Sequence, residues 1–152
     1  MTSAGRRAGL LLLALIAVPL IAHAESPSPR GEVFVIEYAA DRDLTTADRS
    51  VAVDGLTVNV SMSRPATALK PIHFAVEIQN GQAAVDATGV ELAFNMKMDM
   101  GRRAVALQRD GAAWRGEVTL PPCVMGGKRW YARLRFTAGG RAHETVFLFD
   151  LS

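Results

Sequence analysis

Hydrophobic and polar residues alternate along most of the chain. Between Gly55 and Met62 the apolar side chains occupy every second position, and a short run rich in strand-forming residues, 33–38, precedes them. Such alternation is typical of half-buried strands in an antiparallel sheet. The same pattern recurs further along the chain, in residues 72–79, 89–98, 114–120, 129–137 and 143–150.

Turn signals separate these stretches. Asn80-Gly81, Asp110-Gly111 and Gly139-Gly140 fall between successive runs, and such pairs are favoured in tight turns. The polar stretch 39–50 predicts a loop or one helical turn, and no stretch has the period of an amphipathic helix. We therefore predict an all-β fold for residues 32–152, an immunoglobulin-like antiparallel β-sandwich of seven to eight strands. A small closed barrel is the alternative architecture.

The beginning of the chain has the pattern of a secretory signal peptide. An apolar run over residues 10–22 follows Arg6 and Arg7 and ends in Ala22-His23-Ala24, which is a basic region, a hydrophobic region and a cleavage motif in order. We predict a signal peptide at residues 1–24 and a flexible, proline-containing mature N-terminus at residues 25–31. The apolar run is short for a membrane span, which needs about 20 residues. No stable span is therefore expected after cleavage, and an uncleaved anchor is the alternative.

The charge of the chain depends on this leader. The 152 residues include 17 basic and 15 acidic side chains, a net charge of +2. Removal of Arg6 and Arg7 leaves equal numbers of each sign, so the exported domain is neutral. A neutral domain with interspersed charges gives no reason to expect binding to nucleic acid or to an anionic membrane.

Signals of catalysis are absent from the sequence. It has no G-x-S-x-G, no glycine-rich phosphate loop after a strand, no H-E-x-x-H and no C-x-x-C. After the leader there are two histidines, His73 and His143, and the one cysteine, Cys123, which excludes an internal disulfide. We therefore predict that the protein is not an enzyme. A thiol-redox role for Cys123 is a weaker alternative.

The unusual feature is a group of methionines. Met96, Met98 and Met100 are spaced by two, so an extended chain would point all three thioethers to one face. Cys123 and Met125 have the same spacing and would project together from a loop. Thioether and thiolate sulfurs are soft ligands that suit Cu(I).

These sulfurs define a candidate metal site, with first-choice ligands and reserve residues. We select Met98, Met100 and Cys123 as Cu(I) ligands, and Met96, Met125 and His73 as reserves. The competing interpretation is structural: Met96 continues the inward phase of the strand before it and would fill the core, and Cys123 would be a small buried hydrophobe. On that interpretation the histidines are ordinary surface residues or residues with satisfied hydrogen bonds, and both tryptophans are packing residues.

Several short motifs resemble a known group of proteins. The chain has M-x-M-x-M-G at residues 96–101, W-R-G-E-V-T-L at 114–120, P-P-C at 121–123 and R-W-Y-A-R-L at 129–134. In this order they resemble the FixH-like and YtkA-like families of small bacterial envelope proteins, over roughly Leu56 to Phe149. The resemblance implies an immunoglobulin-like sandwich and an accessory role in the periplasm. In FixH-like proteins that role is tied to copper supply and maturation of respiratory oxidases.

The resemblance carries over to particular residues. The positions that match its motifs are Met96, Met98, Met100 and Cys123, with Met125 adjacent. Together with the leader it predicts an exported, periplasmic accessory protein that handles Cu(I), in oxidase maturation or copper homeostasis, and passes it to an envelope protein partner. The alternative is a metal-free periplasmic interaction or adaptor module.

Overall fold

The computed structural model describes residues 33–152 and shows an all-β protein. The predicted leader, residues 1–24, and the segment 25–31 lie outside the described residues. The prediction of an all-β fold built from antiparallel strands is confirmed. The strands are β1 (Arg49–Val53), β2 (Leu56–Met62), β3 (Pro71–Asn80), β4 (Ala83–Ala84), β5 (Ala87–Asn95), β6 (Arg103–Ala106), β7 (Gln108–Asp110), β8 (Ala113–Thr119), β9 (Arg129–Ala138) and β10 (Arg141–Asp150).

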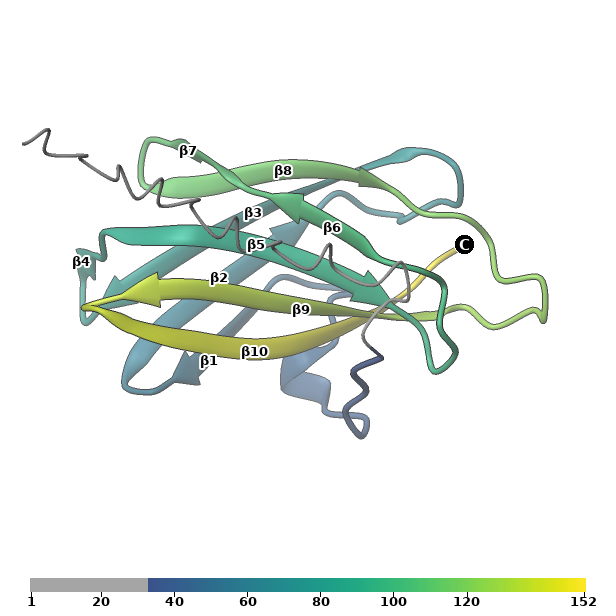
Figure 1. The fold of residues 1–152 in the computed structure, drawn as a ribbon, viewed down its shortest axis with the longest axis horizontal. Coiled ribbons are helices and arrows are strands. Elements are labelled where there is room, and N and C mark those ends of the chain that lie inside the picture. The colour runs from purple at the N-terminus through teal and green to yellow at the C-terminus, as the bar shows by residue number, and fades with distance from the viewer. Residues whose placement is uncertain (1–32) are drawn as a thin grey trace, which may run out of the picture.

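The strands form two sheets that face each other (Figure 1). One has the order β1-β2-β3-β8-β7, with β4 added to β3, and the other has the order β10-β9-β5-β6. The chain between β6 and β7 passes from one sheet to the other at Leu107, which is buried. Within residues 33–152 no helix is long and apolar enough to cross a bilayer.

The core lies between the two sheets and is rich in aromatic rings. The alternating pattern of β3 turns Phe74 inward, where its ring centroid is 5.3 Å from that of Phe94 and 5.9 Å from that of Phe149. Phe94 and Phe149 belong to the facing sheet. Ring pairs of this kind add about 0.5–1.5 kcal/mol each to the free energy gained by burial. Trp114 and Trp130 are also buried, as the packing interpretation of both residues requires.

The number of strands differs from the prediction. The described residues form ten strands, where the sequence indicated seven to eight. Strands β4, β6 and β7 are two to four residues long, which is too short for alternation to be visible. Strand β1 was not predicted, and its first two residues fall in the predicted loop 39–50. Val51 and Val53 are nevertheless buried at alternate positions, and the Asp54-Gly55 turn returns the chain into β2.

The run Val33–Tyr38 was predicted as a strand and is not one. It follows the outer side of the four-stranded sheet, where its rings meet basic side chains of β9. The guanidinium carbon of Arg133 lies 4.4 Å from the ring centroid of Phe34, and that of Arg129 lies 5.5 Å from the ring centroid of Tyr38. The segment is therefore held by side-chain packing and not by a sheet ladder.

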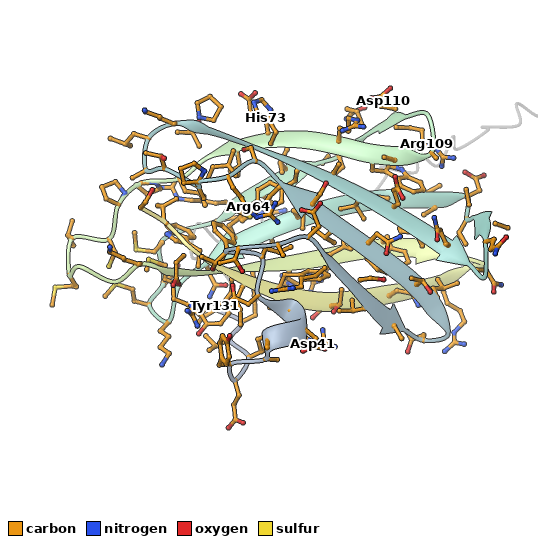
Figure 2. All side chains as sticks on the ribbon, turned by 180° about the vertical axis from the view of Figure 1, so that it is seen from behind. Asp41, Arg64, His73, Arg109, Asp110 and Tyr131 are labelled. Atoms are coloured by element: carbon orange, nitrogen blue, oxygen red, sulfur yellow. The ribbon has the colours of Figure 1, made fainter. Side chains whose placement is uncertain are left out.

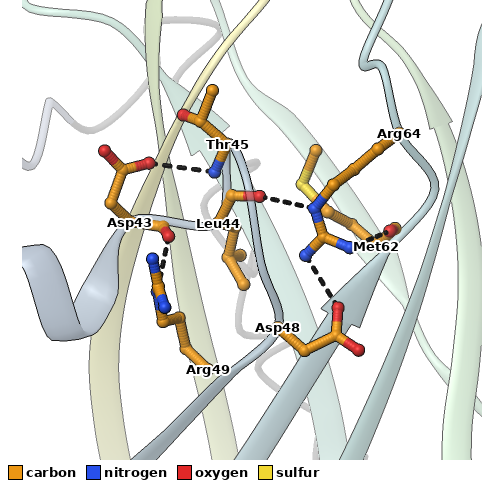
Figure 3. A network of polar contacts seen from close by, with 7 residues as sticks. All are labelled: Asp43, Leu44, Thr45, Asp48, Arg49, Met62 and Arg64. Atoms are coloured by element: carbon orange, nitrogen blue, oxygen red, sulfur yellow. Dashed lines mark hydrogen bonds and ion pairs between the residues drawn. The ribbon is translucent and has the colours of Figure 1, made fainter.

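The next part of the chain is fastened by Arg64, which follows β2 (Figure 3). Its Nε donates to the carbonyl oxygen of Leu44 at 3.0 Å, and one terminal nitrogen is 2.7 Å from a carboxylate oxygen of Asp48. Arg49 donates from Nε to the carbonyl oxygen of Asp43 at 2.6 Å. These bonds join residues 43–49 to the loop after β2.

The start of β9 is tied to the end of β10 by a bidentate ion pair. Nε and a terminal nitrogen of Arg129 lie 2.7 and 3.0 Å from the two carboxylate oxygens of Asp150. The hydrogen bonds from Arg129 lower the pKa of Asp150 below its ordinary value of 3.8. Both side chains are about one-third exposed, so solvent screens the pair and its contribution to stability is modest.

This pair predicts a pH dependence of stability. A carboxyl group whose pKa is lowered by folding stabilises the protein above its unfolded pKa, and that contribution is lost as the pH falls through the folded pKa. We expect Asp150→Asn to lower the free energy of unfolding by up to about 1 kcal/mol at neutral pH, and the difference from wild type to disappear in acid. Denaturant unfolding at both pH values measures it. Asp110→Asn, in the more exposed pair with Arg115, is the control, and a difference that persists unchanged in acid would contradict the account.

Candidate functional site

Three loops meet at one end of the two sheets, at the right in Figure 1. They are residues 63–70 after β2, residues 96–102 after β5 and residues 120–128 after β8, and we call this region the sulfur end. Backbone hydrogen bonds connect the first loop to the third: Leu69 donates to the carbonyl oxygen of Leu120 at 2.9 Å. The second and third loops meet through sulfur atoms.

The central contact of the sulfur end joins Cys123 and Met98. The Sγ atom of Cys123 lies 3.8 Å from the Sδ atom of Met98, in a geometry where the thiol donates and the thioether accepts. The two residues are 25 positions apart in sequence. Met98 is 42% exposed and Cys123 is half-buried, so both sulfurs are near the surface. The structure therefore brings together two of the three residues selected as ligands.

Met96 lies on the inner side of this contact. It is 4% exposed and belongs to the hydrophobic core, as the structural interpretation of this residue predicted. A Cβ added at Gly127 would lie 3.2 Å from Cε of Met96 and 3.6 Å from Sγ of Cys123. Gly127 therefore leaves the space in which the end of Met96 approaches the cysteine.

The extended arrangement expected for the three methionines is wrong. Strand β5 ends at Asn95, and the chain bends at Lys97 and Met98. Pairing between β5 and β6 begins at Phe94 and Arg103, so the intervening residues are a connecting loop. The three thioethers consequently have different environments: Met96 is buried, Met98 is exposed and Met100 packs half-buried against the core.

Two of the reserve residues lie outside the sulfur contact. Met125 is 77% exposed, at the tip of the turn that begins at Cys123. His73 projects from the outer face of β3 (Figure 2), where Nδ1 lies 3.4 Å from a carboxylate oxygen of Glu117. The other histidine, His143, is buried against Phe136 and bonded to Asp54 at 2.8 Å, which is one of the two structural roles expected for the histidines.

Two residues that shape the site were not identified from the sequence. Asn95 is 2% exposed, and its Nδ2 donates to the carbonyl oxygen of Met96 at 2.7 Å, so it fixes the backbone where the methionine loop begins. Gly127 is the other. The available signals were an amide at the end of an apolar strand and a Gly-Gly pair after P-P-C, and neither specifies a function by itself.

The donor atoms that meet at the sulfur end are soft sulfurs. Across residues 33–152 there is no cluster of three or more His, Cys, Asp or Glu side chains that could hold a metal ion. A site at the sulfur end would therefore depend on one thiol and its neighbouring thioethers. Beside Cys123 a shallow pocket of about 190 Å³, lined also by Ala68, Gly127 and Leu151, gives the thiol a second open side.

Comparisons with known proteins give no family for this chain. No family model matches it, and no curated protein matches it. Among solved structures, a crystal structure of an engineered protein is similar with a TM-score of 0.44 at 14% sequence identity. The match covers 61% of this chain and 20% of the other, so the aligned part is a small fraction of that protein. A likeness at this level assigns neither a family nor an activity.

The geometry predicts an order of oxidation for the methionines. Sulfoxide formation follows exposure, so we expect dilute hydrogen peroxide to convert Met125 and Met98 about tenfold or more faster than Met96. Peptide mass spectrometry over time measures the three rates, and the buried Met62 is an internal control. Equal rates for Met96 and Met98 would contradict the described loop.

Proposed function

We propose that the protein is an exported accessory protein of the bacterial envelope that carries Cu(I) as cargo and passes it to an envelope partner. The observation that carries this proposal is the 3.8 Å approach of the Cys123 and Met98 sulfurs at an exposed end of the domain. Thiolate and thioether together are the ligand types that favour Cu(I) over hard divalent ions. The signal-peptide pattern of residues 1–24 supports a periplasmic location.

The separation of the two sulfurs suits a low-coordinate site. Metal–sulfur bonds of about 2.3 Å put two ligands of a trigonal site about 4 Å apart, and those of a linear site about 4.6 Å apart. The observed 3.8 Å is close to the trigonal value. Met98 and Cys123 could therefore hold one ion with small side-chain movements and leave one position for a third ligand.

Two sources could supply the third ligand. Met96 is one candidate within the chain, because its end and Cys123 border the same space beside Gly127. The alternative source is the partner, whose own sulfur or imidazole could enter from the solvent side where Met98 is exposed. A site that exchanges ligands in this way releases its ion without unfolding.

The two ligands would have different roles in transfer. Cys123 binds a metal as the thiolate, so loading releases its proton, whereas a thioether has no proton to lose. We assign Cys123 as the ligand that holds the ion longest, and Met98 as the ligand that leaves first because it is more exposed. The sequence contains no catalytic motif, and we propose a carrier and not an enzyme.

The finer description of the fold belongs to the same proposal. Two facing antiparallel sheets with an aromatic core support an immunoglobulin-like sandwich. The motif resemblance to FixH-like and YtkA-like proteins supports a place in that group. It also favours respiratory oxidase maturation or copper homeostasis as the setting.

A metal-free adaptor is the second candidate function. The observation that favours it is the exposure of Val124 and Met125, 92% and 77%, on a surface loop beside the cysteine. Exposed apolar residues grouped in this way are typical of interaction surfaces. On this proposal the sulfurs form part of a contact surface and no ion is held.

Anaerobic titration of Cu(I) against a competing chromogenic chelator separates the two candidates. We expect the exported protein to hold about one ion, and Cys123→Ser and Met98→Leu each to weaken binding by at least about tenfold, since even outer-shell partners of metal ligands change affinity about 10–100-fold. Met100→Leu is the matched control, because Met100 packs against the core. Proton release on loading should occur in wild type and be absent in Cys123→Ser.

The same titration can reject the carrier. Failure of the wild type to compete with the chelator would leave the adaptor as the function. A loss in Met100→Leu as large as in Met98→Leu would contradict the site as described, even with copper bound.

A further inference from the structure

The exposed apolar residues of the domain are gathered at the sulfur end. Seven large hydrophobic side chains of the described residues are exposed, and three of them, Val33, Val35 and Tyr38, belong to the segment before the sheets. The other four are all in the loops of the sulfur end: Leu69, Met98, Val124 and Met125. The connections at the opposite end contribute none.

Tight turns place three of these residues at the surface. The amide of Gly126 donates to the carbonyl oxygen of Cys123 at 3.0 Å, which puts Val124 and Met125 at the centre of the turn. The amide of Lys70 donates to the carbonyl oxygen of Thr67 at 3.2 Å. Leu69 is a central residue of this turn and is 68% exposed. Such positions usually hold Gly, Asn, Asp, Ser or Pro. Apolar side chains at these turn positions depart from the usual composition of tight turns. Departures of this kind are expected at functional sites.

The loops that carry the exposed apolar residues also carry basic side chains. Lys70, Lys97, Arg102 and Lys128 are exposed in the three loops, and Arg64 adds a fifth positive charge that is paired with Asp48. These loops contain a single acid, Asp99. The connections at the opposite end, residues 54–55, 81–86, 111–112 and 139–140, hold two acids, and the strand ends beside them add Arg109, Asp110 and Arg141. The chain is near neutral overall, yet its charge is unevenly divided between the two ends.

We propose that the sulfur end docks on an anionic phospholipid surface. Leu69, Val124 and Met125 would enter the interface between headgroups and acyl chains, and the lysines of the same loops would lie at the anionic headgroups. This combination of exposed apolar residues and a basic rim, the five basic residues of the three loops, is complementary to such a bilayer in both hydrophobicity and charge.

The composition of the rim favours lipid over a protein surface. Protein interfaces are depleted of lysine and enriched in tyrosine, tryptophan and arginine. The rim has three lysines and two arginines, of which Arg64 is paired with Asp48, and the exposed hydrophobics of these loops include no aromatic residue. Lysine also suits a membrane interface because its long stem lies along apolar surface while the charge remains in water.

Vesicle binding tests this proposal without copper. The exported protein is incubated at low ionic strength with vesicles of phosphatidylcholine alone, or of phosphatidylcholine and phosphatidylglycerol in equal parts, and the bound fraction is measured by flotation. We expect binding to the anionic vesicles only, weakening as salt is added. Mass spectrometry identifies the N-terminus, and any retained leader is common to all variants.

Two matched pairs of variants locate the docking surface. Lys128→Glu at the sulfur end is compared with Arg141→Glu at the opposite end, which changes the charge equally. We expect the first to weaken binding by at least about fivefold, the equivalent of ~1 kcal/mol for one basic residue near an anionic surface, and the second to have little effect. In the second pair, we expect Val124→Ser to weaken vesicle binding and Val35→Ser to have little effect. Thermal unfolding checks that each variant is folded.

The outcomes separate docking from the proposed cargo. No binding to anionic vesicles, or binding that is reduced equally by both members of each pair, overturns the docking proposal and leaves the sulfur end to a protein partner. Docking does not require copper, so a failed Cu(I) titration with vesicle binding intact rejects the carrier alone. The reverse result rejects docking alone.

Discussion

The packing of Phe74 against Phe94 and Phe149 is the interaction on which the rest of the structure depends. These rings come from opposite sheets, so their contact sets how the sheets lie against each other. This packing fixes the ends of the strands in space, and the strand ends determine where the attached loops lie. The loop 96–102 joins β5 to β6 within one sheet, whereas the loop 120–128 crosses from β8 in the other sheet to β9. Strand β9 pairs with β5, and the two loops meet at the end of that pairing.

The same packing explains why a soft-ligand site could form without any metal-binding motif. A thiol and a thioether that are remote in sequence approach to 3.8 Å because each is carried by a connection at the same end of the domain. The buried Asn95 fixes the start of one loop, and the ion pair between Arg129 and Asp150 fastens the strand that follows the other. The strands thus support both loops, and the two sulfurs lie near the surface.

The sequence predicted the long strands well, because strands such as β2 and β3 alternate between buried and more exposed positions. It did not predict β1 or the short β6 and β7, whose few residues leave little pattern to detect. It also assigned a strand to Val33–Tyr38, where the Phe34 ring packs on Arg133 while Val33, Val35 and Tyr38 are exposed. Residue spacing selected Met98 and Cys123 but could not show where β5 ends, and Met100 was therefore grouped with them. The near-neutral net charge did not indicate that basic residues collect at one end of the domain. Only the fold brings the loops of each end together, so this distribution cannot be read from the sequence.

The central claim is that Met98 and Cys123 act together as ligands of one ion. Copper X-ray absorption of the Cu(I)-loaded protein tests this most directly, because it counts the sulfur neighbours of the metal. The account predicts two or three sulfur ligands at about 2.3 Å, with one fewer in Met98→Leu. A first shell of nitrogen or oxygen, or a sulfur count unchanged in Met98→Leu, would contradict it.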